Sequence, residues 1–163
     1  MFSPAVFHSL DRVLRENRVN ELLVFNKVLK KHGLVLTPSD AEEIIAARTR
    51  VLENQGRIEL DINVSKTLIN RIAMSSYVNQ DNYVETINEM YEIFHYIKNA
   101  SSDLVSDEEV IDAIMVYYDQ VCGGSTEYVM GKGIEKILDN YHHRKNMAEV
   151  IMDREEEYWD LSE

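Results

Sequence analysis

Two short segments of the chain place a carboxylate three residues before a histidine. Glu92 precedes His95, and Asp139 precedes His142. On a helix this spacing puts both side chains on one face, one turn apart, as di-iron helical bundles require. Such a site also needs two further inward carboxylates, and the second segment has Asp where Glu is usual. The hypothesis of a small metal-dependent enzyme that uses these four residues is therefore kept as the alternative.

The single cysteine, Cys122, is the other residue with reactive chemistry. A helix that starts near Thr126 could lower the pKa of its thiol and make it a nucleophile. No histidine is close in sequence, and a buried thiol beside the Gly123-Gly124 turn is the favoured interpretation. One cysteine forms no internal disulfide, which indicates a reducing compartment and predicts a cytoplasmic location.

Composition limits the classes of partner. The net charge is −12, which disfavours nucleic acids and anionic membranes, because both must be neutralised by basic residues. No apolar stretch approaches the roughly 18 residues that a membrane span needs. Nucleic-acid binding is therefore the least favoured hypothesis, and it rests on one group of basic residues: Arg12, Arg15, Arg18, Lys27, Lys30 and Lys31.

Most of the chain shows the apolar periodicity of amphipathic helices. Thr37-Pro38 predicts a capped helix start, Gly33 and Gly56 predict left-handed helix ends, and Ser106 with Glu109 predicts a capping box. Asn17 marks either a turn or a bend between the first two helices. The expected helices span 4–16, 18–32, 38–56, 62–75, 82–98, 107–121, 126–141 and 143–160.

Two short segments are typical of strands instead. Ile58, Leu60 and Ile62 alternate with polar residues, and the other segment is 34–36. Both are very short, so we interpret them as extended linkers whose apolar residues pin the helix ends. The sequence thus predicts an all-α fold, a single domain over 1–163 that is a bundle or array of six to eight helices. The terminal helices, 4–16 and 143–160, are candidates for a peripheral position.

Four stretches of the chain are similar to an uncharacterised family of clostridial-type bacterial proteins, a domain of unknown function. The resemblance covers about residues 26–130 and implies no activity, cofactor or site residue. The stretches are His32-Gly33-Leu34-Val35-Leu36-Thr37, Gln55-Gly56-Arg57-Ile58-Glu59, Tyr77-Val78-Asn79-Gln80-Asp81-Asn82-Tyr83 and Val121-Cys122-Gly123-Gly124-Ser125-Thr126-Glu127-Tyr128.

The chain has many amphipathic helices and no convincing catalytic, metal or cofactor motif. The first hypothesis is therefore that it is a non-enzymatic interaction or accessory protein. We expect it to bind a protein partner or a second copy of itself through its terminal helices, whose charges are complementary. The two helices meet either within one chain or between two chains, and a dimer that exchanges them is slightly preferred. The candidate interface residues are Phe7, Leu10, Leu14, Ile151, Tyr158 and Trp159.

Overall fold

The computed structural model describes the backbone of residues 4–142, with all side chains among them except those of Pro4, Phe7 and His8. Of the described residues, 76% are helical, and none lies in a strand. The labelled helices, α1 to α7, fall within the predicted range of six to eight. The all-α prediction is therefore confirmed. The predicted helix over 143–160 lies outside the described residues.

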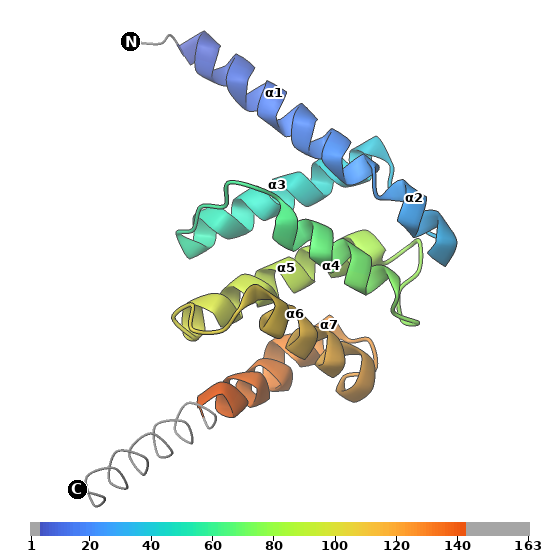
Figure 1. Cartoon of the computed structure of the whole chain (residues 1–163), viewed down its shortest axis with the longest axis vertical. Helices are drawn as coiled ribbons and strands as arrows, with labels where there is room; N and C mark the ends of the chain where they lie inside the picture. Colours follow the sequence, from blue (N-terminus) through green and yellow to red (C-terminus); the bar gives the residue numbers. More distant parts are fainter. Residues whose placement is uncertain (1–3, 143–163) are drawn as a thin grey trace, which may run out of the picture.

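The first helix, α1, spans Pro4–Leu23 without interruption. Asn17 is exposed on its surface, so neither the turn nor the bend considered there forms. The chain turns instead after Leu23, and a short helix α2 (Asn26–Leu29) and a 3₁₀ turn (Lys30–His32) complete the segment. Figure 1 shows α1 leaving the body as an arm, with residue 142 at the opposite end of the molecule.

The signals at both ends of α3 (Pro38–Gln55) act as the sequence predicts. The Thr37 hydroxyl accepts a hydrogen bond from the backbone N–H of Asp40, and the Asp40 carboxylate accepts one from the N–H of Thr37. At the other end Gly56 adopts φ +63°, a left-handed conformation that side chains with a Cβ disfavour. This glycine turns the chain into an irregular loop, 57–62, which bends at Leu60 and Asp61 and leads to α4 (Asn63–Ala73).

The centre of the fold is α5 (Tyr83–Ala100), which packs against α3, α4 and α6 (Asp107–Val116). More than half of its residues are buried, including two basic ones, His95 and Lys98. A helix surrounded on several sides by others must bury polar side chains as well as its apolar face, and each of these needs a partner. Those partners build the site described below.

After α6 the chain continues into a π-helical turn, Tyr117–Val121, so the predicted helix to 121 changes its hydrogen bonding part-way. The Ser106 hydroxyl caps α6 through the N–H of Glu109, but no reciprocal bond from the Glu109 side chain forms. A second helical run starts at α7 (Thr126–Tyr128), passes through another π-turn (Val129–Gly133) and continues to residue 142.

The cap at Thr37 gives the first prediction. Thr37→Ala should lower the free energy of unfolding by roughly 0.5–2 kcal/mol, because the N–H of Asp40 loses its acceptor. Urea titration followed by circular dichroism measures the change. Ser39→Ala, an exposed neighbour in the same turn, should change stability by less than about 0.5 kcal/mol. Equal effects of the two substitutions would contradict the assigned cap.

Candidate functional site

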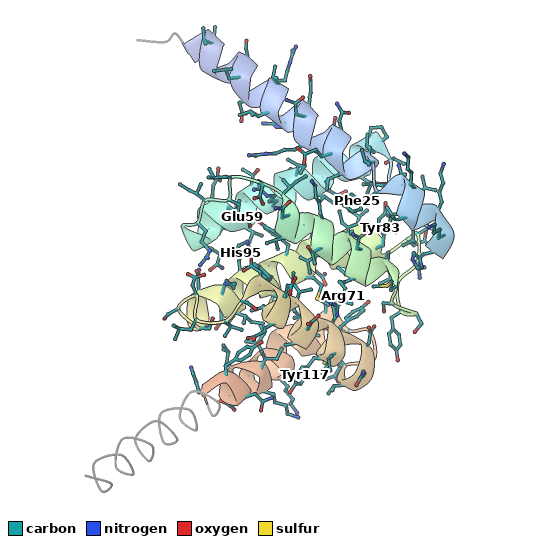
Figure 2. All side chains as sticks on the ribbon, viewed as in Figure 1. Phe25, Glu59, Arg71, Tyr83, His95 and Tyr117 are labelled. Carbon is teal, nitrogen blue, oxygen red and sulfur yellow. The ribbon has the colours of Figure 1, made fainter. Side chains whose placement is uncertain are left out.

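Three side chains from two parts of the chain meet beneath the 57–62 loop. Glu59 comes from the loop itself and His95 from α5 (Figure 2). Tyr91 lies one turn before His95 on the same helix. One carboxylate oxygen of Glu59, Oε1, accepts a hydrogen bond from the Tyr91 hydroxyl and lies 2.5 Å from His95 Nε2. The side chains of Glu59 and His95 are only 14% and 3% exposed. The loop is therefore tied to α5 through a nearly buried carboxylate.

The fourth member of this cluster is Arg48, on the inner face of α3. Its side chain is 2% exposed, and its Nη2 lies 3.9 Å from Glu59 Oε2. The same nitrogen donates hydrogen bonds to the backbone carbonyls of Glu59, at 3.1 Å, and Asp61, at 2.8 Å. A buried guanidinium requires both charge compensation and hydrogen-bond acceptors. The loop supplies both, and we call these four residues, Arg48, Glu59, Tyr91 and His95, the loop anchor.

The Glu59 carboxylate sets the direction of the hydrogen bonds in the loop anchor, because it can only accept. Burial, and then the hydrogen bond to the Glu59 carboxylate, raise the pKa of Tyr91 far above its usual value, so its hydroxyl stays a donor. His95 Nδ1 is buried without a hydrogen-bond partner among the described residues. The Glu59 carboxylate can only accept, so the ring donates from Nε2. The ring also packs edge-on against Tyr91 and Phe94.

A second polar group lies next to the anchor, at the C-terminal end of α5. Arg57 forms two hydrogen bonds to the Asp103 carboxylate and a third to Asn99. The buried Lys98 ammonium donates to the Val105 carbonyl at 2.7 Å and lies 2.9 Å from Asp107. These bonds join the start of the loop to the turn that follows α5. The Arg57 guanidinium holds the pKa of the Asp103 carboxyl below its usual value.

A pocket of about 390 Å³ lies between these two groups and is lined by His95, Lys98 and the side chains of the loop. Carboxylate, imidazole and phenol are groups that serve general acid–base catalysis elsewhere. Here, however, each is bonded to another member of the anchor. The most direct effect of these contacts is that the loop is held in one conformation.

Comparison with known proteins identifies the relatives of this chain. A family model described as a family of unknown function, DUF6323, matches residues 21–147. The chain belongs to the DUF6323 family. The match confirms the resemblance to a domain of unknown function and extends beyond the 26–130 expected from the sequence. No curated protein and no solved structure matches the chain. Every residue of the loop anchor lies within the DUF6323 match, whereas most of α1 precedes it.

The four residues of the metal hypothesis do not form one site in this DUF6323 chain. Glu92 is exposed on α5 and faces a different pocket from the one that His95 lines. Asp139 and His142 are exposed on the run that ends at residue 142. Within the described residues no three His, Cys, Asp or Glu side chains gather in a way that could hold a metal ion.

Cys122 lies between the two π-turns and is partly buried. Burial raises the pKa of its thiol, and Lys136 offsets only part of that effect. Burial therefore disfavours the thiolate and acts against the activation by the helix at Thr126 that the sequence left open.

The candidate interface residues fall in two groups. Leu10 and Leu14 are 54% and 53% exposed on the arm formed by α1, while the side chain of Phe7 and all of Ile151, Tyr158 and Trp159 lie outside what the structure describes. Among the basic residues of the nucleic-acid hypothesis, Arg12 pairs with Glu16 and Arg15 with Asp11 along α1. Across the described residues, no helix has the length and apolarity needed to cross a bilayer.

Sequence reasoning missed the partners of His95. Two signals were present: Arg48 falls on the apolar stripe of its helix, and Tyr91 stands four residues before His95 on another. An arginine on a core-facing stripe requires a buried acceptor. Nothing local to Glu59 indicates that it is that acceptor, since it is 11 residues from Arg48 and 36 from His95 along the chain.

The loop anchor gives the second prediction. Glu59→Ala should lower the free energy of unfolding by about 3–5 kcal/mol, because the buried Arg48 charge loses its counter-ion. Glu92→Ala is the matched control on the exposed face of α5 and should change it by less than about 0.5 kcal/mol. Urea unfolding measures both. A loss of stability in Glu59→Ala no larger than that in Glu92→Ala would contradict the loop anchor.

The Arg57–Asp103 pair gives the third prediction. A carboxyl whose pKa is lower in the folded state stabilises the fold above its unfolded pKa of about 4 and loses that effect as pH falls through the folded value. Asp103→Asn should therefore be less stable than wild type at pH 7, and the difference should shrink as pH falls below about 4. Asparagine is the suitable replacement because Asp103 has φ +59°, which asparagine tolerates. Unfolding curves at several pH values measure the difference, with exposed Asp139→Asn as the control. A difference that stays constant with pH would contradict the pairing.

Proposed function

We propose that this DUF6323 chain is a non-enzymatic interaction or accessory protein of the bacterial cytoplasm and that it self-associates through α1. The observation that carries the proposal is an apolar stripe on α1 that turns away from the body. Its members are Val6, Leu10, Val13 and Leu14, which are between 40% and 54% exposed. We call them the arm stripe.

Helix geometry separates the arm stripe from the face that attaches α1 to the body. Val19 and Leu22 are buried, and the groove beside them is lined by α3. At about 100° per residue, the arm stripe and the attached face lie on roughly opposite sides of the helix. The body of the same molecule, as far as it is described, therefore cannot cover the stripe. Four adjacent exposed apolar side chains at helical spacing are typical of a helix-binding surface.

The occupant that we propose is residues 143–163 of a second copy. That segment carries seven Asp/Glu and three Lys/Arg, a net charge of −4, whereas residues 1–33 carry six Lys/Arg and three Asp/Glu, a net charge of +3. Opposite charges favour their encounter and orient the pairing. The described chain ends at residue 142, at the far end of the molecule from the arm (Figure 1). A partner copy brings the segment to the stripe without crossing the length of one molecule, and reciprocal exchange gives a closed two-fold dimer.

The fourth prediction tests this dimer. Sedimentation equilibrium of wild type should show a dimer, and Leu10→Glu with Leu14→Glu should give a folded monomer, because carboxylates replace the apolar contact. Met74→Glu with Leu104→Glu is the control, since these side chains are 62% and 71% exposed elsewhere on the molecule. The control should remain dimeric.

Trp159 is a fluorescence probe for the proposed occupant, because it is the only tryptophan in the chain and lies in the segment 143–163. Its emission should shift to longer wavelength when the arm stripe is mutated, and Ile151→Glu should also abolish the dimer. A dimer that survives Ile151→Glu would mean that the stripe pairs with another surface. A wild-type chain that stays monomeric at high concentration would refute self-association.

A further inference from the structure

A pocket of about 280 Å³ lies between α6 and the helical run that ends at residue 142. Each wall is one face of a helix, because the lining residues recur at spacings of three and four along the chain. One wall includes Glu109, Asp112, Val116 and Tyr117, and the facing wall includes Ile137 and Tyr141. The Tyr141 hydroxyl donates to the Glu109 carbonyl at 3.2 Å, which joins the two walls. We call this cavity the Tyr117 pocket.

The Tyr117 pocket lies where α6 departs from regular helical geometry. Tyr117 is the first residue of the π-turn that follows α6 (Figure 2), and its carbonyl accepts from the Cys122 N–H, five residues on, at 2.7 Å. The run that starts at Thr126 then lies beside α6 (Figure 1). Single π-turns within helices occur frequently at functional sites. The position of the pocket therefore favours a ligand over a simple packing defect.

Two aromatic rings and two aliphatic side chains line the pocket. Tyr117 and Tyr141 are partly buried, Ile137 is almost fully buried, and Val116 is half-exposed. The faces of aromatic rings attract cations, and quaternary ammonium ions are the ligands that proteins recognise in this way. The volume is just below the range of about 300–1,000 Å³ that is typical for drug-sized ligands. The pocket therefore suits a single small group.

The charge around the pocket is negative. Residues 99–131 contain seven Asp/Glu and no Lys/Arg, and none of the described residues that line the pocket is basic. Asp112 is already paired with Arg71 from α4. Among the described residues, however, no hydrogen bond or ion pair engages the Glu109 carboxylate. A cation in the pocket therefore meets one uncompensated carboxylate, whereas an anion is repelled.

We propose that the Tyr117 pocket binds a methylated ammonium group, with the cation against the rings of Tyr117 and Tyr141 and beside the Glu109 carboxylate. Two sources carry this chemistry: a free choline-type molecule and a trimethylated lysine side chain. A metal ion is disfavoured because it requires several oxygen ligands, and an unmethylated ammonium because it is strongly hydrated. The site is separate from the arm stripe and does not depend on the proposed dimer.

Titration of the isotope-labelled full chain with choline, followed by amide chemical shifts in NMR spectra, tests the proposal. We expect saturable shifts at the pocket residues. The neutral analogue in which carbon replaces the choline nitrogen should not bind, because it has the same shape without the charge. Tyr117→Leu and Glu109→Gln should each weaken choline binding at least about threefold, because they remove an aromatic face and the carboxylate. The control Glu108→Gln changes an exposed neighbour outside the pocket and should bind as wild type does.

A second pair of ligands, N-acetyl-trimethyllysine amide and its unmethylated counterpart, separates the two sources. The methylated ligand that binds more tightly, choline or the trimethyllysine derivative, identifies the source. Three results would overturn the proposal: no shifts with either methylated ligand at millimolar concentration, equal binding by the neutral or unmethylated counterpart, or wild-type binding by both the Tyr117 and the Glu109 variants. The Leu10/Leu14 variant should bind choline as wild type does, so failure of the dimer and failure of this site are separable.

Discussion

The guanidinium of Arg48, buried on the inner face of α3, imposes the constraint on which the loop and its surroundings depend. A buried cation must find an anion and hydrogen-bond acceptors, since leaving it uncompensated costs several kcal/mol. Within the described residues, the 57–62 loop provides both, through the Glu59 carboxylate and two backbone carbonyls. Glu59 faces inward, and its neighbours Ile58 and Leu60 are 88% and 93% exposed, so they do not pin helix ends as the sequence pattern predicted. One charge on one helix thus accounts for the inward orientation of Glu59.

The central helix completes the arrangement. Tyr91 and His95 are four residues apart, so they lie on the same face of α5, beneath the loop. Both bond the same oxygen of Glu59, which leaves its other oxygen for Arg48. Lys98, less than one turn further along the helix, bonds the turn that also holds Asp103, the partner of Arg57. Polar contacts therefore hold the loop at two points. Its middle is held through Glu59 by α5, and its start is held through Arg57 by the turn after α5.

Local signals predicted the helices well, because caps and apolar periodicity are properties of neighbouring residues. Thr37, Gly33 and Gly56 each act where the pattern placed them. The orientation of the loop was not predictable in this way. Burying Ile58 and Leu60 would contribute about 1.5–3 kcal/mol each, which is why alternation is normally read with the apolar side inward. The unpaired Arg48 would cost about 3–5 kcal/mol, and the unmet carbonyl and phenol bonds would add to that. The two apolar side chains together amount to about 3–6 kcal/mol, so the polar requirement prevails only when those hydrogen bonds are included. Its partners are far apart along the chain and leave no periodic signal.

Helix α1 also has an arrangement of apolar residues that local sequence signals did not predict. Between Pro4 and Leu23 the apolar residues change face, from the arm stripe to the side that holds Val19 and Leu22. The sequence left either a turn or a bend open at Asn17, yet an exposed asparagine costs a helix little and the helix continues through it. A single helix with two opposed apolar faces has two surfaces to bury. The body satisfies the second, and the first lies mostly before the residues that the DUF6323 match covers. Within the described residues, the body therefore covers the face of α1 that holds Val19 and Leu22 and leaves the arm stripe exposed, and this difference between the two faces is the basis of the proposed self-association.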